Sequence, residues 1–205
     1  GAIHVPLADY DGDGDIDIAT VISQDEEELW ILENVASRCF KKRLIYKTNN
    51  FEFGMGGLLS HDVDNDGDMD FLIPSGDNLE RPVHFPQSYH GCYLMTNNGD
   101  MSFSIRRIGD LPGCYAIDVG DFDADGDCDV IAVSMSNDYT EAHSASVVLL
   151  NNDGVGFFTT KQISAKPIRL ITCSMGDVDG DGLSDIVTGG LRFHPPRGYA
   201  GMIRA

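Results

Sequence analysis

Apolar residues recur along the chain in short runs, and polar turn residues separate one run from the next. The segments 16–22, 69–73 and 128–133 are rich in β-branched side chains, which favour strands. Glycine, aspartate and asparagine lie between such runs, as is typical of tight turns. The pattern therefore predicts an all-β chain built from short strands.

One segment fits two structures. Ser23 and Glu26 are spaced as in a capping box, which would begin a helix over 24–34. A strand is the alternative, and we favour it because landmarks in this segment recur in strand-like runs later in the chain.

These landmarks define a repeat. Acidic segments begin at Asp9, Asp62, Asp121 and Asp177, at spacings of 53, 59 and 56 residues, and periods of this size indicate propeller blades. In the first three repeats an asparagine then closes an apolar run, and a phenylalanine follows six residues later. The pairs are Asn34 with Phe40, Asn97 with Phe103, and Asn151 with Phe157.

Each repeat is expected to form four antiparallel strands, which is typical of a β-propeller blade. The predicted strands are 57–62, 69–75, 91–96 and 103–108 in the second repeat, and 114–120, 128–135, 146–151 and 157–163 in the third. We expect one repeat domain over 1–205, with blades at about 1–50, 51–110, 111–166 and 167–205. The fourth repeat stops before its phenylalanine, so we expect an incomplete ring, either a fragment of a larger polypeptide or one completed by a further chain.

The acidic residues concentrate in four nine-residue segments that hold 19 of the 33 carboxylates. Each segment reads D-x-D-x-D-G-x-x-D and precedes an apolar residue. Such a density of like charge is unfavourable without a counter-ion. Calcium takes about six to eight oxygen ligands in a flexible geometry and suits carboxylates at alternating positions, whereas Mg²⁺, the alternative, keeps more of its waters.

The spacing assigns candidate ligands for up to four Ca²⁺ ions. Positions 1, 3, 5 and 9 would offer carboxylates. Position 7 would offer its backbone carbonyl, because the last segment has a leucine at this position. Glycine at position 6 permits the sharp turn. The candidate metal-binding residues are Asp9, Asp11, Asp13, Asp15 and Asp17; Asp62, Asp64, Asp66, Asp68 and Asp70; Asp121, Asp123, Asp125, Asp127 and Asp129; and Asp177, Asp179, Asp181, Leu183 and Asp185.

An EF-hand is a weaker interpretation of these segments. It requires a bidentate glutamate at position 12, where this chain has Thr20, Ile73, Ala132 and Thr188. The flanking runs also favour strands over helices. We therefore expect each acidic loop to link two strands.

The overall charge limits the partners. Lys and Arg number 14 against 33 Asp and Glu, and the formal net charge of −19 argues against nucleic acid and anionic membranes. No apolar run approaches the roughly 18 residues that span a bilayer. The five cysteines lack C-x-x-C spacing, so we expect buried free thiols, with one disulfide and a leftover cysteine as the alternative.

The acidic loop with its following apolar strand resembles the calcium loop of FG-GAP/VCBS repeats, the blades of integrin α-subunit propellers and many bacterial secreted proteins. The segments 75–78 (Ser-Gly-Asp-Asn) and 89–91 (Tyr-His-Gly) are similar to those in VCBS arrays of large bacterial exported proteins, some fused to c-type cytochromes. The resemblance implies a calcium-stabilised, extracytoplasmic propeller that serves as an interaction or scaffold module, without common catalytic residues.

Two classes of function remain. The first is a non-catalytic module with a protein or glycan ligand, and the insertions 76–90 and 136–144 are candidate binding loops. Millimolar extracellular calcium fills loops of modest affinity, which favours an extracellular or periplasmic location. The alternatives are the propeller domain of a carbohydrate-active lyase or hydrolase, with His84, His90 and His143 as its polar cluster, or an accessory subunit of a larger extracytoplasmic assembly that includes a cytochrome. Because the sequence has no recognised catalytic motif, we favour the first.

Overall fold

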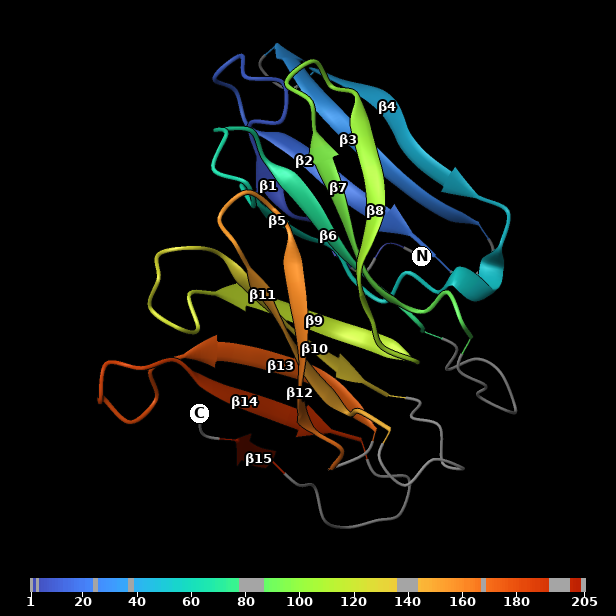
Figure 1. Ribbon diagram of the computed structural model, residues 1–205. Coiled ribbons are helices and arrows are strands. Elements are labelled where there is room, and N and C mark those ends of the chain that lie inside the picture. Colours follow the sequence, from blue (N-terminus) through green and yellow to red (C-terminus); the bar gives the residue numbers. More distant parts are fainter. Residues whose placement is uncertain are drawn as a thin grey trace.

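The computed structural model describes residues 2, 4–23, 26–36, 39–77, 87–135, 144–166, 169–191 and 200–203 (Figure 1). These residues contain no α-helix, only a short 3-10 helix, η1 (Phe51–Phe53). Their fifteen strands are β1 (Leu7–Ala8), β2 (Asp17–Ile22), β3 (Glu27–Ala36), β4 (Cys39–Thr48), β5 (Leu59–His61), β6 (Asp70–Ser75), β7 (Gly91–Asn97), β8 (Phe103–Asp110), β9 (Cys114–Gly120), β10 (Asp129–Ser134), β11 (Val147–Asn152), β12 (Phe158–Ser164), β13 (Leu170–Gly176), β14 (Asp185–Gly190) and β15 (Ala200–Ile203).

The strands form four antiparallel sheets, and in each sheet they follow one another in chain order. The first sheet is β1–β4, the second β5–β8, the third β9–β12, and the fourth has β13–β15 among the described residues. This meander is the blade that the repeat predicted. The all-β fold of an incomplete propeller is confirmed: the first and fourth sheets lie at opposite ends of the row, and the ring is not closed (Figure 1).

The ambiguous segment at 24–34 resolves as a strand in its described part, so the helix alternative is wrong. β3 lies between β2 and β4, with Ile18 opposite Leu32 and Glu33 opposite Lys41. Two partner strands satisfy its backbone N–H and C=O groups. The capping-box spacing is a local signal, and pairing on both edges overrides it.

Apolar side chains fill the space between each pair of adjacent sheets. The first core joins the first and second sheets, the second core joins the second and third, and the third core joins the third and fourth. Alternate residues of β10 point to opposite cores: Val130 faces the second sheet, while Ile131 faces the fourth. Burial on both faces explains why this strand is a continuous apolar run rather than an alternating one.

One landmark of the sequence alignment is wrong by a single residue. In the third sheet, Asn152 lies opposite Phe158, as Asn34 lies opposite Phe40 and Asn97 opposite Phe103. The equivalent residues are therefore Asn152 and Phe158, not Asn151 and Phe157. The chain has Asn-Asn and Phe-Phe at these places, so a spacing of six fits both registers. Only the strand pairing decides between them.

The cysteines match the expectation of free thiols but not the expectation that all are buried, because Cys39 is exposed and Cys173 is half-buried. All five are free thiols, and Cys92, Cys114 and Cys128 are buried. Burial raises the pKa of the Cys128 thiol to about 12, which keeps it protonated at neutral pH. Among the described residues, no helix has the length and apolar character needed to cross a membrane.

Candidate metal centres

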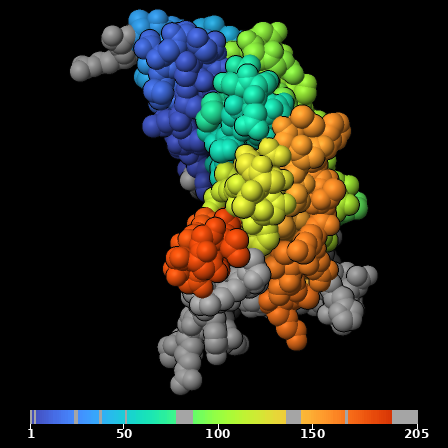
Figure 2. Space-filling view, turned by 60° about the vertical axis from the view of Figure 1, so that its left-hand side comes forward, coloured from blue at the N-terminus to red at the C-terminus, as the bar shows by residue number. Residues whose placement is uncertain are grey.

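The four acidic segments occupy equivalent places in the fold. Each one connects the first strand of its sheet to the second. All four loops therefore project from the same side of the row of sheets, on the left in Figure 1. Figure 2 brings this side forward and shows them in a descending series from blue through teal and yellow to orange-red. The prediction that the loops link strands is confirmed.

The first aspartate of each loop holds the turn by accepting backbone N–H groups. In the second loop, Asp62 accepts from Asp66 (3.1 Å) and Gly67 (3.0 Å). In the fourth loop, Asp177 accepts from Asp181 (3.2 Å) and Gly182 (3.0 Å). The same pattern holds in the first and third loops. The four loops thus share one backbone conformation.

Glycine at position 6 is required by the backbone. The φ angles of Gly14, Gly67, Gly126 and Gly182 are 93°, 97°, 93° and 88°, in a region that L side chains rarely adopt. No atom lies within 4 Å of a Cβ built at these glycines, so the requirement is conformational and not steric.

The ninth aspartate connects the loop to the sheet. One oxygen of Asp70 accepts the N–H of Val63 (3.1 Å), and the other accepts the N–H of Asn97 (2.8 Å) at the end of β7. Asp17 and Asp129 make the same two bonds in their own sheets. These three aspartates are fully buried. The ninth position therefore ties the start of its loop to the end of the third strand.

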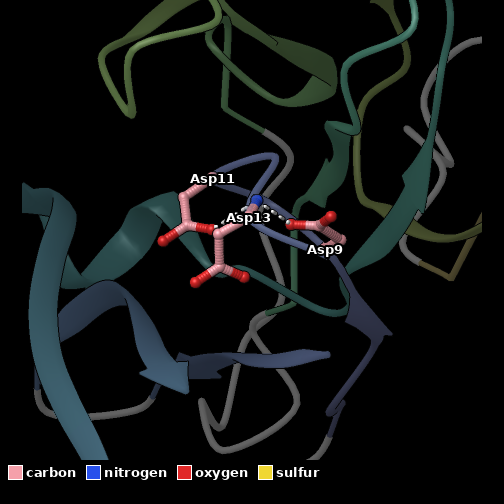
Figure 3. Close-up of side chains that lie close together, drawn as sticks. All are labelled: Asp9, Asp11 and Asp13. Atoms are coloured by element: carbon pink, nitrogen blue, oxygen red, sulfur yellow. Dashed lines mark hydrogen bonds between the residues drawn. The ribbon is translucent and has the colours of Figure 1, made fainter. Parts of the chain in front are cut away.

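The carboxylates of each loop converge closely enough to share an ion. Four groups of three aspartates each offer oxygen atoms that all lie within 4.8 Å of one another. Figure 3 shows the first group, with the backbone N–H of Asp13 bonded to Asp9 and Asp11. The groups are Asp9, Asp11 and Asp13; Asp62, Asp64 and Asp66; Asp121, Asp123 and Asp129; and Asp177, Asp179 and Asp185.

Positions 1 and 3 belong to every group, while the third member varies. It is position 5 in the first two loops and position 9 in the last two. The seventh side chain belongs to no group, and that of Leu183 is 56% exposed. This fits the prediction that position 7 of the loop offers its backbone carbonyl to the ion. The assignment of individual ligands otherwise stays a prediction.

Burial, together with the neighbouring carboxylates, raises the pKa of several loop aspartates. Burial raises the pKa of Asp70 to about 6, despite the two N–H groups that favour its ionised form. Burial, then the neighbouring Asp66 and Asp62, raises the pKa of Asp64. One oxygen of Asp64 is also buried with no hydrogen-bond partner among the described residues. These are sites at which a positive ion would relieve an unfavourable arrangement.

Comparison with known families supports this description. A model of the FG-GAP-like repeat matches residues 8–73 and 121–188. The two matched ranges together contain all four acidic loops. The chain belongs to the FG-GAP-like repeat family. A search of curated proteins finds no match.

The sequence did not reveal how the FG-GAP-like sheets are joined to one another. The side-chain amide of Asn97 donates to the carbonyl of Tyr10 (3.0 Å), in the loop of the preceding sheet. Asn152 donates in the same way to Val63 (3.0 Å). Asn97 was visible as a landmark and the landmark of the third repeat was placed one residue early, but the targets lie 87 and 89 residues away along the chain.

Two buried polar side chains make further junctions. Glu27, at the start of β3, accepts the N–H of Met55 (2.8 Å), which leads into the second sheet. His90, just before β7, accepts the N–H of Gly113 (3.3 Å), which leads into the third sheet. Both residues lie at the beginning of a third strand, Glu27 as its first residue and His90 just before it, but their types differ, so no sequence pattern relates them.

The histidines named as a polar cluster do not support a catalytic site in the described residues. His90 is 2% exposed, and both of its ring nitrogens contact backbone groups, Nε2 lying 3.1 Å from the carbonyl oxygen of Glu52. Burial lowers its pKa, which favours a neutral structural imidazole. His84 and His143, with most of the insertions 76–90 and 136–144, lie outside the described residues.

Proposed function

We propose that this chain is a calcium-binding β-propeller module that acts without catalysis, as an interaction or scaffold domain of an extracytoplasmic protein. The observation that carries the proposal is the convergence of three carboxylates in each of four loops of one backbone conformation. Three nearby carboxylates without a cation repel one another, and a divalent ion converts that repulsion into attraction.

The donor set favours calcium over other metals. The groups contain only carboxylates, without the histidine or cysteine ligands that zinc and copper prefer. Loop carbonyls and water can complete the larger, flexible shell of Ca²⁺, whereas Mg²⁺ requires near-octahedral geometry and retains its waters. Both hard cations bind oxygen, so competition between them is the direct test.

The role of the ion would be structural. Each loop joins the first two strands of a sheet, and the ninth aspartate also holds the third. The unfolded chain has no preformed site, so the free energy of ion binding adds to the free energy of folding. At a free calcium concentration about 100-fold above Kd, each filled site would stabilise the fold by about 2.7 kcal/mol.

The test is to measure ion content and thermal stability together. We expect calcium to raise the Tm strongly, excess chelator to lower it, and excess Mg²⁺ to replace calcium poorly. Elemental analysis of the calcium-loaded protein should find up to four ions per chain. A Tm that is identical in calcium and in chelator, with no bound ion, would contradict the proposal.

A pair of variants sharpens this test. Asp64→Ala removes a member of the second group and should lower the ion count by one, as measured by isothermal titration calorimetry. Asp110→Ala is the matched control, because this exposed aspartate pairs with Arg107 outside the loops. An equal effect of both substitutions on the ion count would contradict the assignment of the second loop.

The extracytoplasmic location that we propose rests on the calcium affinity expected of such loops. A Kd of about 10⁻⁴ to 10⁻³ M is typical of extracellular modules, because cytosolic calcium is too dilute to fill such sites. The formal charge of −19 disfavours nucleic acid, so a protein or a glycan is the ligand class we propose. A measured Kd of about 10⁻⁷ M or tighter would remove the calcium argument for this location.

A further inference from the structure

The second acidic loop is covered more closely than the first, although a described sheet follows each of them. At position 3, Asp64 is half-buried while Asp11 is exposed. One oxygen of Asp64 is buried without a hydrogen-bond partner among the described residues, and no oxygen of Asp11 is buried in this way. The φ angles of Gly14 and Gly67 are 93° and 97°, so the two loops have the same turn. The difference therefore comes from what lies over each loop.

The β11–β12 hairpin, residues 152–157, lies over the second loop. A Cβ built on Gly156 would be 3.6 Å from the Cβ of Asp64. Asn152 connects the hairpin to this loop, because its amide donates to the carbonyl of Val63 (3.0 Å) and its oxygen accepts the N–H of Gly156 (3.0 Å). The orange hairpin lies beside the teal loop in Figure 2. The third sheet therefore reaches position 3 of the second loop.

Arg106, on β8 of the second sheet, contacts the same hairpin. Its guanidinium donates to the carbonyl of Gly156 and lies 5.7 Å from the centre of the Phe157 ring. Its Nη2 atom is 3.2 Å from the place that a Cβ of residue 156 would occupy, so a larger residue there would compete with Arg106 for space. A hydrogen bond and a cation–π contact thus bind the hairpin to the second sheet.

The hairpin that follows the first loop is held differently. Met101 takes the place of Gly156, four residues after the asparagine, and its side chain is buried in the first core. Arg43 takes the place of Arg106, three residues after the phenylalanine, and it bonds to Glu33 of its own sheet. Among the described residues, no arginine of the first sheet is bonded to the hairpin of the second.

We propose that the β11–β12 hairpin makes the second loop a tighter calcium site than the first, with Arg106 as the positioning residue that holds the hairpin in place. The inference rests on the proposed calcium function and adds an order of affinity to it. In the empty second loop, one oxygen of Asp64 has neither water nor a donor, which is unfavourable. An ion supplies the missing partner, whereas at the exposed Asp11 it must first displace water.

The charge of Arg106 acts against the ion, but this effect is the weaker one. Arg106 is exposed, and interactions between exposed charges are screened over a Debye length of about 8 Å at physiological ionic strength. The attraction between an ion and a buried carboxylate oxygen is screened much less. We therefore expect the cover to raise the calcium affinity of the second loop more than the guanidinium charge lowers it.

A calcium titration followed by NMR reports on the two loops separately. The N–H of Gly67 donates to Asp62 in the second loop, and that of Gly14 donates to Asp9 in the first, so each amide signal reports the filling of its own loop. We expect the midpoint of Gly67 at a calcium concentration about tenfold lower than that of Gly14. This factor corresponds to about 1.4 kcal/mol, within the range that an unpaired buried polar group costs. Equal midpoints, or an earlier midpoint of Gly14, would overturn the proposal.

Arg106→Met tests the positioning residue. It removes both contacts of the arginine with the hairpin and should raise the Gly67 midpoint about three- to tenfold, while the first loop keeps its midpoint. Arg107→Met is the matched control, because it removes the same charge from the adjacent residue, whose guanidinium contacts Ser88 and Asp110 instead. An unchanged or lower Gly67 midpoint in Arg106→Met, or the same rise in both variants, would overturn the role of Arg106.

Gly156→Ala displaces the hairpin in a second way. The new Cβ would lie 3.2 Å from Nη2 of Arg106 and 3.6 Å from Cβ of Asp64, at a φ of 85°. This variant should also raise the Gly67 midpoint, and the amide signals of the third sheet show whether it remains folded. A folded Gly156→Ala with the wild-type midpoint would contradict the role of the hairpin.

The same titrations separate this proposal from the one on which it rests. If neither glycine signal responds to calcium and the Tm is the same in calcium and in chelator, both proposals fail. If both signals respond with one midpoint and calcium raises the Tm, the calcium function stands and only the order of affinity is overturned.

Discussion

The loops at 62–70 and 177–185 have the same backbone but different surroundings. In both, the first aspartate accepts N–H groups from positions 5 and 6, and the glycine φ angles are 97° and 88°. Yet Val63 is fully buried under the third sheet, while Val178 is 53% exposed. The nine-residue pattern therefore sets the conformation of the loop, and the neighbouring sheet sets its burial.

The ninth aspartates show the same contrast. Asp70 accepts two buried N–H groups, from Val63 and from Asn97. Asp185 accepts the N–H of Val178, and the place of the asparagine in the fourth sheet falls outside the described residues. Among the described residues, an internal loop thus holds the first three strands of its own sheet together, whereas the fourth loop is seen to hold its own hairpin.

The second and fourth loops should differ most in the loss of stability when the ninth aspartate is replaced by alanine. Asp70→Ala leaves two buried N–H groups without an acceptor and should lower the free energy of unfolding by roughly 2–5 kcal/mol. Asp185→Ala removes the acceptor of one partly buried N–H and should cost roughly 1–2 kcal/mol. Urea unfolding in saturating calcium measures both, since loss of an ion would affect either variant. Equal losses of stability in the two variants would contradict the idea that the ninth aspartate holds more of the structure in the second loop than in the fourth.

A smaller difference in stability cost is expected between two asparagines at the ends of third strands, Asn97 and Asn34. Asn97→Ala removes a buried bond to the preceding sheet and should cost roughly 1–3 kcal/mol, because the carbonyl of Tyr10 loses its donor. Asn34→Ala removes an exposed bond within its own loop and should cost less than about 1 kcal/mol. A larger cost at Asn34 than at Asn97 would show that the asparagine acts within its own loop.

The smallest difference in stability cost between the second and fourth loops, close to zero, is expected for the glycine at position 6. Gly67→Ala and Gly182→Ala each force an L side chain to a positive φ without a steric clash, at a cost of about 1–2 kcal/mol. Because this strain is local, the two values should agree even though the loops differ in burial. Denaturant unfolding of both variants measures it, and a much greater cost at Gly67 would mean that packing contributes to the turn.

How far the sequence predicted the structure varies from element to element. The strands at 91–96 and 114–120 were predicted nearly to the residue, because turn residues bound short apolar runs on both sides. The acidic loops were located from the spacing of their aspartates. The prediction of Asn151 as the landmark was wrong, and Asn152 is the equivalent residue. A shift of one residue leaves the spacing to the phenylalanine unchanged, although it reverses the face that each side chain occupies.

The sequence by itself determined the loop conformation and the repeat, since aspartates, glycine and backbone N–H groups within nine residues are sufficient to form the turn. Only the tertiary structure decided which of these equivalent positions are buried, and which asparagine reaches a neighbouring sheet. Burial depends on what covers a residue, and the covering sheet comes from a part of the chain more than fifty residues away. Val63 and Val178 are the same residue at the same position of the same motif, and only the sheet beside them makes them different.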